Sequence, residues 1–318
     1  MKTEDAAKLN LVEISKICAN EDAARDLMES ILWPTGPVCP HCKGTKAYKL
    51  VPKPGSKTRK GLYKCADCRK QFTVTVGTIF ADSHIPISKW LMAIFILCSA
   101  KKAISAHQLH RSLGIAYKSA WFMAHRLRYA MEHADFTKKL SGVVEVDECY
   151  FGPKPPRDGG PKTEKIAVVG MVERKTGERR STLHKHVVAD SMATLINEHV
   201  EDGATINTDS SGLYDHTPLW FNHKSVNHER RGKDGQREYY RIDKTGDVVT
   251  TNFVESSFSL LRRGVIGAFH HISQKHLHRY VSEFDFRWNH RKTTCGERTI
   301  AMLAKTPGKR LKYANLTA

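Results

Sequence analysis

The stretch GVVEVDECYFG, residues 142–152, is the first strongly strand-like run of the chain, and it carries three carboxylates among its valines. Asp147 lies in its middle, flanked by Glu145 and Glu148. Because a buried carboxylate is costly unless it is paired or coordinates a cation, Asp147 is a candidate functional residue. One aspartate alone is more simply explained as a surface or capping residue, so its role depends on what the rest of the chain supplies.

The sequence after this strand alternates between strand-like and helical patterns, which is typical of a mixed α/β domain over residues 139–300. We expect strands at 166–172, 180–188 and 204–208, and helices at 191–201, from Asn252 onward and at 275–289. Residues 301–318 are expected to form a C-terminal tail.

Two later motifs add further polar side chains to this domain. GATINTDSSGLYD, residues 203–215, contains a short buried strand that ends in Asp209, and a strand end is a natural site position in an α/β sheet. TNFVESSFSLLRRGVIG, residues 251–267, offers Asn252 and Glu255, which share a helix face because they are three residues apart. Arg262 lies further along the same helix and could meet a phosphate.

These residues have the chemistry of a metal-dependent phosphodiester site. Two strand-borne aspartates and one helix-borne acid or amide supply the oxygen ligands that Mg²⁺ or Mn²⁺ takes. Two such ions can clamp the attacking and leaving oxygens of an in-line displacement. Three candidate ligands in this order, two of them on apolar strands, favour this interpretation over coincidence.

The charge of the chain indicates a polyanionic partner. There are 51 Lys and Arg against 33 Asp and Glu, a net charge of +18, and neutralised phosphates release condensed counterions. A basic protein that charge keeps soluble, or a ribosome-associated one, is the alternative. The most apolar run, Leu91–Cys98, is about half the ~20 residues that a membrane helix needs. The acidic N-terminus argues against a signal peptide, so we expect a cytoplasmic, nucleoid-associated protein without a membrane partner.

Two CxxC pairs predict a structural zinc ribbon over residues 36–78. One pair alone could be free thiols, but two pairs with 22 residues between them can complete a tetrahedral site. Four thiolates leave no position for water, so the metal is expected to be structural. His41 could replace one cysteine, which is the weaker alternative. The expected ligands are Cys39, Cys42, Cys65 and Cys68.

Helical patterns flank the ribbon on both sides. Residues 1–35 show apolar positions at helical spacing. Within residues 79–138, a helix from Ser105 to Leu113, a break at Gly114 and a second helix from Lys118 resemble a helix-turn-helix. Simple helical packing is the alternative, but the basic second helix favours DNA contact. The candidate DNA-binding residues there are Lys118, His125, Arg126 and Arg128.

Taken together, these motifs resemble the DDE-type transposases of bacterial insertion sequences. The most similar subgroup is ISXO-like, carries an N-terminal zinc ribbon and has distant relatives among the Merlin elements. The resemblance covers roughly residues 20–300. It rests on CPHC and CADC, QFTVTVGTIFADSHIPISKWLMAIF (71–95), VEVDECYFG, NTDSSGLY and TNFVESSFSLLRRGVIGAFHHISQKHLHRYVSEFDFRWNHR (251–291).

The resemblance implies an RNase H-like fold over residues 139–300, with Asp147 and Asp209 as the first two metal ligands. The family uses Glu or Asn as the third ligand, and we favour Glu255 over Asn252 because Arg262 follows seven residues later. Arg replaces the commoner Lys there. Arg262, Arg263 and the helix HRYVSEFDFRWNHR (278–291) are expected to contact phosphates. His223 and His228 could bind DNA or assist the site, although surface histidines are the simpler interpretation.

The function expected from these features is DNA transposition. The ribbon and helix-turn-helix would recognise terminal inverted repeats, and the acidic site would cleave the element's ends and join them to target DNA. We expect the chain to act as a homo-oligomer on DNA. The alternatives are a zinc-ribbon DNA-binding regulator and a structure-specific nuclease without strand transfer.

Overall fold

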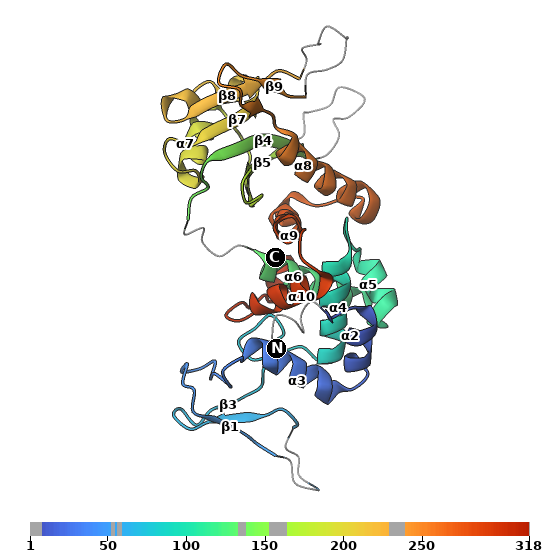
Figure 1. Cartoon of the computed structure of the whole chain (residues 1–318). Coiled ribbons are helices and arrows are strands. Elements are labelled where there is room, and N and C mark those ends of the chain that lie inside the picture. Colours follow the sequence, from blue (N-terminus) through green and yellow to red (C-terminus); the bar gives the residue numbers. More distant parts are fainter. Residues whose placement is uncertain are drawn as a thin grey trace. The chain divides into compact units, whose positions relative to one another are not determined.

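The computed structural model describes residues 8–51, 55, 59–132, 138–152, 164–228 and 239–317. The chain divides into two compact units (Figure 1). Met1–Met131 and Lys292–Ala318 make up the first unit, and Glu132–Arg291 makes up the second. Among the described residues, no helix combines the length and apolar character needed to cross a membrane.

A mixed five-stranded sheet forms the centre of the second unit. Its strand order is β6-β5-β4-β7-β8, with β4 antiparallel to β5 and parallel to β7. The sheet thus begins as an antiparallel meander and continues with parallel strands across the central β4. The strands are β4 (Val143–Phe151), β5 (Ile166–Glu173), β6 (Arg179–His184), β7 (Thr205–Asp209) and β8 (Asn222–Val226).

Helices cover the two faces of this sheet, as Figure 1 shows. Helix α7 (Ala189–His199) packs apolar side chains, including Ile196, against Val144 and Val146 of β4. Helix α8 (Asn252–Gly264) lies on the opposite face. A Cβ on Gly170, the β5 partner of Asp147, would come within 2.8 Å of the Phe258 ring of α8. Glycine at this position therefore lets α8 approach the sheet closely beside Asp147.

Helix α9 (Leu277–Asn289) is held on β6 by a buried ion pair. The Arg179 Nε lies 3.1 Å from Asp285 Oδ1, and both side chains are nearly inaccessible to solvent. The Ser181 hydroxyl also donates to Asp285, at 2.9 Å. Removing one partner of a buried pair leaves an uncompensated charge, so these residues hold the helix in one position.

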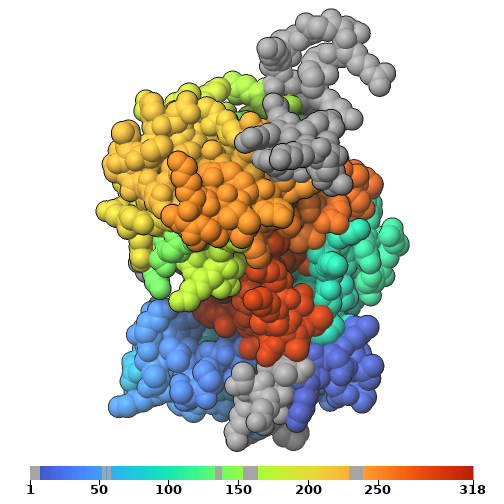
Figure 2. All heavy atoms as spheres, turned by 45° about the horizontal axis from the view of Figure 1, so that its top comes forward, coloured from blue at the N-terminus to red at the C-terminus, as the bar shows by residue number. Residues whose placement is uncertain are grey.

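Most of the expected elements of this unit are confirmed, with differences at their ends. The strand expected at 180–188 ends at His184, and the polar stretch after Asp209 contains the edge strand β8. The sequence NHKSV of β8 is too polar to show an apolar alternation, because an edge strand is only partly buried. The remaining short elements are η1 (Gly212–Tyr214), η2 (Thr217–Leu219), β9 (Arg241–Ile242), β10 (Val248–Val249), the π-helix η3 (Val265–Phe269) and η4 (Gln274–His276). In the space-filling view, the described residues from α7 to α8, coloured yellow to orange, form a continuous surface (Figure 2).

The first unit is helical around the apolar helix α4. Trp90, Leu91 and Ile94 of α4 are buried, and α2, α3 and α10 pack around that helix. The expected tail at 301–318 is instead part of this unit, because Met302 and Leu303 are fully buried. Its helices are α2 (Leu11–Cys18), α3 (Glu21–Leu32), α4 (Ile87–Ser99), α5 (Ala106–Leu113), α6 (Tyr117–Met131), α10 (Cys295–Ala304) and α11 (Ala314–Thr317).

A small three-stranded sheet carries the cysteines, with strands β1 (Ala47–Lys49), β2 (Tyr63–Cys65) and β3 (Gln71–Phe72). Its own core is an aromatic cluster in which Trp33 packs edge-on against Tyr63 and Phe72. The Tyr63 hydroxyl donates to Glu29 of α3 at 2.7 Å. This core is small, so much of the stability of the subdomain has to come from the cysteine cluster.

Candidate active site

The parallel pairing of β4 with β7 puts Asp147 and Asp209 at equivalent positions on neighbouring strands. The register aligns Glu145 with Asn207, and the two aspartates each come two residues later. Residues two apart on a strand point to the same face. Both aspartates therefore project from the face of the sheet that α8 covers.

Glu145 anchors the beginning of α8 to this face. Its Oε2 accepts hydrogen bonds from the backbone N–H groups of Phe253, at 2.7 Å, and Val254, at 3.2 Å. The N-terminus of a helix favours a carboxylate because its first N–H groups have no partner within the helix. Burial nevertheless raises the pKa of Glu145 to about 7, against the effect of these two N–H groups. The sequence indicated no such role for Glu145, because the partners lie 108 and 109 residues away.

Glu255 lies in the first turn of α8, close to the charges of β4. Its Oε1 accepts a hydrogen bond from the Thr251 hydroxyl at 2.5 Å and lies 3.0 Å from His228 Nε2. Its negative charge contributes to the raised pKa of Asp147. Asn252, the alternative third ligand, is exposed at the first position of the helix.

Asp147 interacts with Asp209 and Glu255 and also with Glu148, the next residue of β4, whose side chain points to the opposite face of the sheet. Burial, followed by repulsion from Glu148 and then from Asp209 and Glu255, raises the pKa of Asp147 to about 7. The pKa of Glu148 is also raised, by burial and by Asp209, although Tyr214 donates a hydrogen bond to it at 2.6 Å. Such a concentration of like charge is unfavourable without a cation. The side chains therefore fit a site for divalent metal.

Two arginines of α8 are exposed about two helical turns after Glu255. Arg262 is exposed, and its Nε donates to Cys149 Sγ at 3.0 Å. Arg263 is also exposed and donates to Ser259 of its own helix. Both arginines belong to the same helix as Glu255, and their exposed guanidinium groups can contact a phosphate.

The two histidines before α8 are not free surface residues. His228 contacts both Glu255 and Thr251, with Nε2 2.9 Å from the Thr251 hydroxyl. His223 Nε2 lies 2.8 Å from the hydroxyl of Thr208, the residue before Asp209. His228 therefore lies against a candidate ligand of the acidic site, whereas His223 contacts Thr208, whose side chain points to the opposite face of the sheet from Asp209.

The four cysteines converge in the first unit. Cys39 Sγ lies 3.7 Å from Cys68 Sγ, and Cys42 Sγ lies 3.6 Å from Cys65 Sγ. Thiolates about 2.3 Å from a tetrahedral Zn²⁺ are about 3.8 Å apart. Across the described ranges of the chain, this is the one group of three or more His, Cys, Asp or Glu side chains whose ligand atoms all lie within 4.8 Å of one another. His41, the weaker alternative, is not among them.

The backbone around the two cysteine pairs repeats the same geometry. The N–H of Cys39 donates to the carbonyl of Gly44, and that of Cys65 donates to the carbonyl of Lys70. Lys43 and Arg69, which follow the second cysteine of each pair, both have a positive φ. A Cβ at Gly44 would come within 2.2 Å of Asp67. Burial opposes ionisation of Cys39, but the N–H groups of Cys42 and His41 outweigh it and lower its pKa to about 7.

The structure corrects several expected DNA contacts. Both expected helices form, as α5 and α6, but His125, Arg126 and Arg128 are 0%, 7% and 2% exposed. These side chains face the interior of their unit, where Arg126 Nε donates to the carbonyl of Leu311. In the helix at 278–291, Arg287 is likewise buried and bonded to Glu283.

The start of α6, unlike the buried basic residues later in the helix, is exposed to solvent. Tyr117 is exposed and stacks on His107 of α5, with ring centroids 4.2 Å apart. Lys118 is exposed as well, with its Nζ 4.7 Å from the centre of the Tyr313 ring. Of the four basic residues expected to contact DNA on this helix, Lys118 is thus the accessible one.

Two family models and one relative agree with the resemblance inferred from the motifs. Residues 139–289 match the ISXO2-like transposase domain, and residues 19–71 match the transposase zinc-ribbon domain. A protein of Halobacterium salinarum described as "Uncharacterized protein in transposable element ISH50" is 27% identical over 292 residues, which are 86% of this chain and 92% of that protein. A chain in the solved structure of the simian T-cell lymphotropic virus intasome in complex with PP2A regulatory subunit B56 gamma aligns with a TM-score of 0.27 and 13% identity. The alignment covers 56% of this chain and 63%, less than two thirds, of that one.

Proposed function

Because the chain carries an ISXO2-like transposase domain behind a transposase zinc-ribbon domain, we propose that it is a DNA transposase. It binds the ends of its element, cleaves DNA strands there with the help of divalent metal, and transfers the freed strands to target DNA. The observation that carries this proposal is the meeting of Asp147, Asp209 and Glu255, from β4, β7 and α8, on one face of the sheet.

The proposed catalytic fold is RNase H-like, and the topology of the second unit supports it. Three antiparallel strands are followed by two parallel ones, and the central β4 carries the first acid. The strand that carries the second acid pairs directly with β4. In the first unit, we propose that α5 and α6 act as a helix-turn-helix, with the exposed residues Tyr117 and Lys118 toward DNA.

Asp147, Asp209 and Glu255 would hold Mg²⁺ or Mn²⁺, and the cysteine cluster would hold Zn²⁺. Among the described residues, the oxygens of the three carboxylates do not all lie within 4.8 Å of one another, so what supports this assignment is the shared face and the chemistry of the oxygen ligands. When bound, such ions polarise the scissile phosphate and lower the pKa of an attacking water. Zinc in the ribbon would have a structural role, because four thiolates fill its coordination sphere.

The protein's own side chains position the DNA and the carboxylates. Glu145 fixes the start of α8 over β4 and so places Glu255 toward Asp147. Arg262 and Arg263 lie two turns further along α8, where they can hold phosphates on either side of the scissile one. The net charge of +18 is consistent with binding to a long DNA duplex. Contacts between basic side chains and the phosphate backbone would contribute to this binding without reading the base sequence. Recognition of paired ends would require at least two copies of the chain.

The direct test is strand cleavage and joining by the purified full-length chain. The substrate is a labelled duplex with the sequence of the element's end, which is to be identified in the DNA that flanks the coding region. With Mg²⁺ we expect a nick that leaves a 3′-hydroxyl at the end of the repeat, followed by joined product when target plasmid is added. With EDTA both products should disappear. Cleavage without joining would indicate a nuclease, and binding without either product would indicate a regulator.

We expect His228 to orient Glu255, because its Nε2 lies within hydrogen-bond distance of both Glu255 and Thr251. Groups that orient a metal-ligating carboxylate typically change metal affinity by about 10–100-fold when removed. His228→Ala should therefore raise the Mg²⁺ concentration for half-maximal cleavage by about 10-fold or more, with little change in the rate at saturating Mg²⁺.

His228→Gln supplies the control, because its amide can still donate a hydrogen bond to the carboxylate. This variant should restore most of the Mg²⁺ affinity. An unchanged Mg²⁺ dependence in His228→Ala would show that the contact with Glu255 has no role in metal binding.

A further inference from the structure

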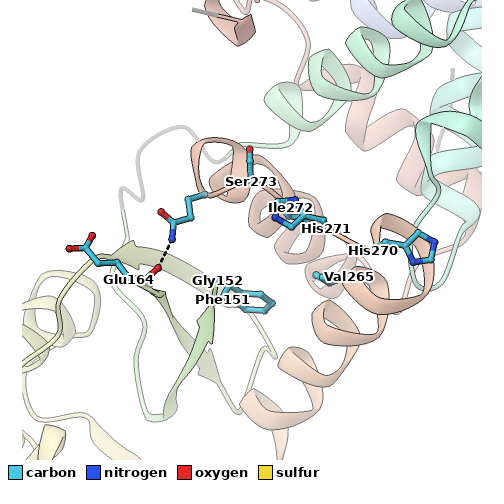
Figure 3. Close-up of a pocket in the computed structure, with 9 residues that line it drawn as sticks. Phe151, Gly152, Glu164, Val265, His270, His271, Ile272 and Ser273 are labelled. Carbon is cyan, nitrogen blue, oxygen red and sulfur yellow. Dashed lines mark hydrogen bonds between the residues drawn. The ribbon is translucent and has the colours of Figure 1, made fainter. Parts of the chain in front are cut away.

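A cavity of about 510 Å³ opens at the far end of β4, within the second unit. Figure 3 shows it between the end of that strand and the segment that follows α8. The Gln274 side chain ties the two sides together, because its Nε2 donates to the carbonyl of Glu164 at 2.6 Å. The residues that line the cavity include Phe151, Val265, His271, Ile272, Ser273 and Gln274.

The cavity continues the face that carries the acidic cluster. Every second residue of β4 points to this face, namely Glu145, Asp147, Cys149 and Phe151. Helix α8 runs along the same face, with Phe253 bonded to Glu145 and Arg262 bonded to Cys149. At about 3.3 Å per residue, Phe151 lies about 13 Å from Asp147 along the strand. Arg262 lies between the acids and the cavity. A DNA strand bound at the acids, with a phosphate at Arg262, therefore reaches the cavity within a few nucleotides.

The wall opposite Phe151 has an unusual backbone. The helix changes from α to π geometry at Val265–Phe269, and the N–H of His270 donates to the carbonyl of Val265. His270 then takes a φ of +60°, which a residue with a side chain rarely adopts. Such departures persist where the surrounding structure imposes them, and they are concentrated at functional sites.

The lining combines apolar and polar side chains. Phe151, Val265 and Ile272 offer apolar contact, while Ser273 and Gln274 carry hydrogen-bonding groups and His271 an imidazole. Exposed basic residues flank the lining segment 265–274 in the sequence. Arg262 and Arg263 precede it, and Lys275 follows it. Aromatic stacking, polar groups for a base edge and cations for the backbone are the features that hold unpaired bases.

We propose that this cavity receives one unpaired base of the DNA strand that is bound at the acidic cluster. The base leaves the helical stack and packs on the Phe151 ring, while its phosphate remains with Arg262. This inference rests on the proposed function, because it requires a DNA strand bound at the acidic cluster. It adds a binding site for one base near the scissile phosphate.

The test measures binding alone, with Ca²⁺ in place of Mg²⁺. The probe is a fluorescent duplex with a short single-stranded extension, in which each extension base in turn is replaced by an abasic sugar. For the wild-type chain, one abasic position should weaken binding about tenfold, the effect expected for losing one stacked base. Phe151→Ala should bind the intact probe about tenfold more weakly and show no further loss at that position. Phe151→Tyr, which keeps the ring, should retain the abasic effect.

Trp220→Ala is the matched control, because Trp220 is a half-exposed aromatic residue elsewhere in the same unit. It should keep the wild-type response to every abasic position. If wild type and Phe151→Ala respond equally to the abasic scan, or no position has an effect, the inference is overturned. That result leaves the proposed function intact if Asp147→Asn still abolishes cleavage. Conversely, the chain could show an abasic effect that depends on Phe151 and yet cut no DNA. That result would support the base-binding cavity and contradict the proposed transposase activity.

Discussion

Asp147→Asn and Asp209→Asn are each expected to abolish strand cleavage while folding and DNA binding persist. Either change removes one negative charge from the face where the carboxylates of β4, β7 and α8 interact. Bound divalent ions contribute several kcal/mol to such a reaction, so the rate should fall by about 1000-fold or more. The measurement is the rate of nicking of the labelled inverted-repeat duplex in Mg²⁺, with anisotropy on the same duplex as the binding check.

Glu255→Gln and Asn252→Ala separate the two candidates for the third ligand. The residues are three positions apart on α8, but Glu255 is the one whose charge acts on Asp147. Glu255→Gln should therefore lose cleavage as the aspartate variants do, and Asn252→Ala should retain it within a few-fold. The opposite pattern would assign the third position to Asn252. Normal cleavage by either aspartate variant would falsify the proposed active site.

Cys65→Ser is expected to unfold the ribbon and release its metal. Its Sγ is fully buried and lies 3.6 Å from that of Cys42, so the substitution removes one of four ligands from the centre of the subdomain. Apparent binding energies of structural zinc are about 10–16 kcal/mol, far more than the small aromatic core of Trp33, Tyr63 and Phe72 can replace. We expect one zinc per wild-type chain by elemental analysis and none in the variant, with rapid proteolysis between residues 36 and 78.

Cys295→Ser is the control for this experiment, since Cys295 is a half-buried cysteine outside the cluster. It should bind one zinc and resist protease as the wild type does. A Cys65→Ser protein that keeps stoichiometric zinc, or a wild-type chain that stays protease-resistant after chelation, would contradict a structural metal at this site.

The contrast between the cysteines and the basic residues of α6 shows where sequence reasoning succeeds. Two CxxC pairs specify their chemistry locally, because each pair has to form the same tight turn, and the repeated hydrogen bonds to Gly44 and Lys70 bear this out. His125, Arg126 and Arg128 also formed a recognisable local pattern, but that pattern carried no information about which face of the helix would be covered. Arg126 is buried with a partner 185 residues away, at Leu311.

At the acidic site, too, some features follow from the local sequence and others from the folded structure. The motif VEVDECYFG and its two successors identified the candidate ligands and their order, because strand alternation and helix spacing are local properties of the chain. Three features came from folding instead: the burial that raises the pKa of Asp147, the anchoring of α8 by Glu145, and the contact of His228 with Glu255. Each depends on bringing together residues that are tens of positions apart or more. Burial and electrostatic repulsion are properties of that assembled neighbourhood, so no local pattern could have revealed them.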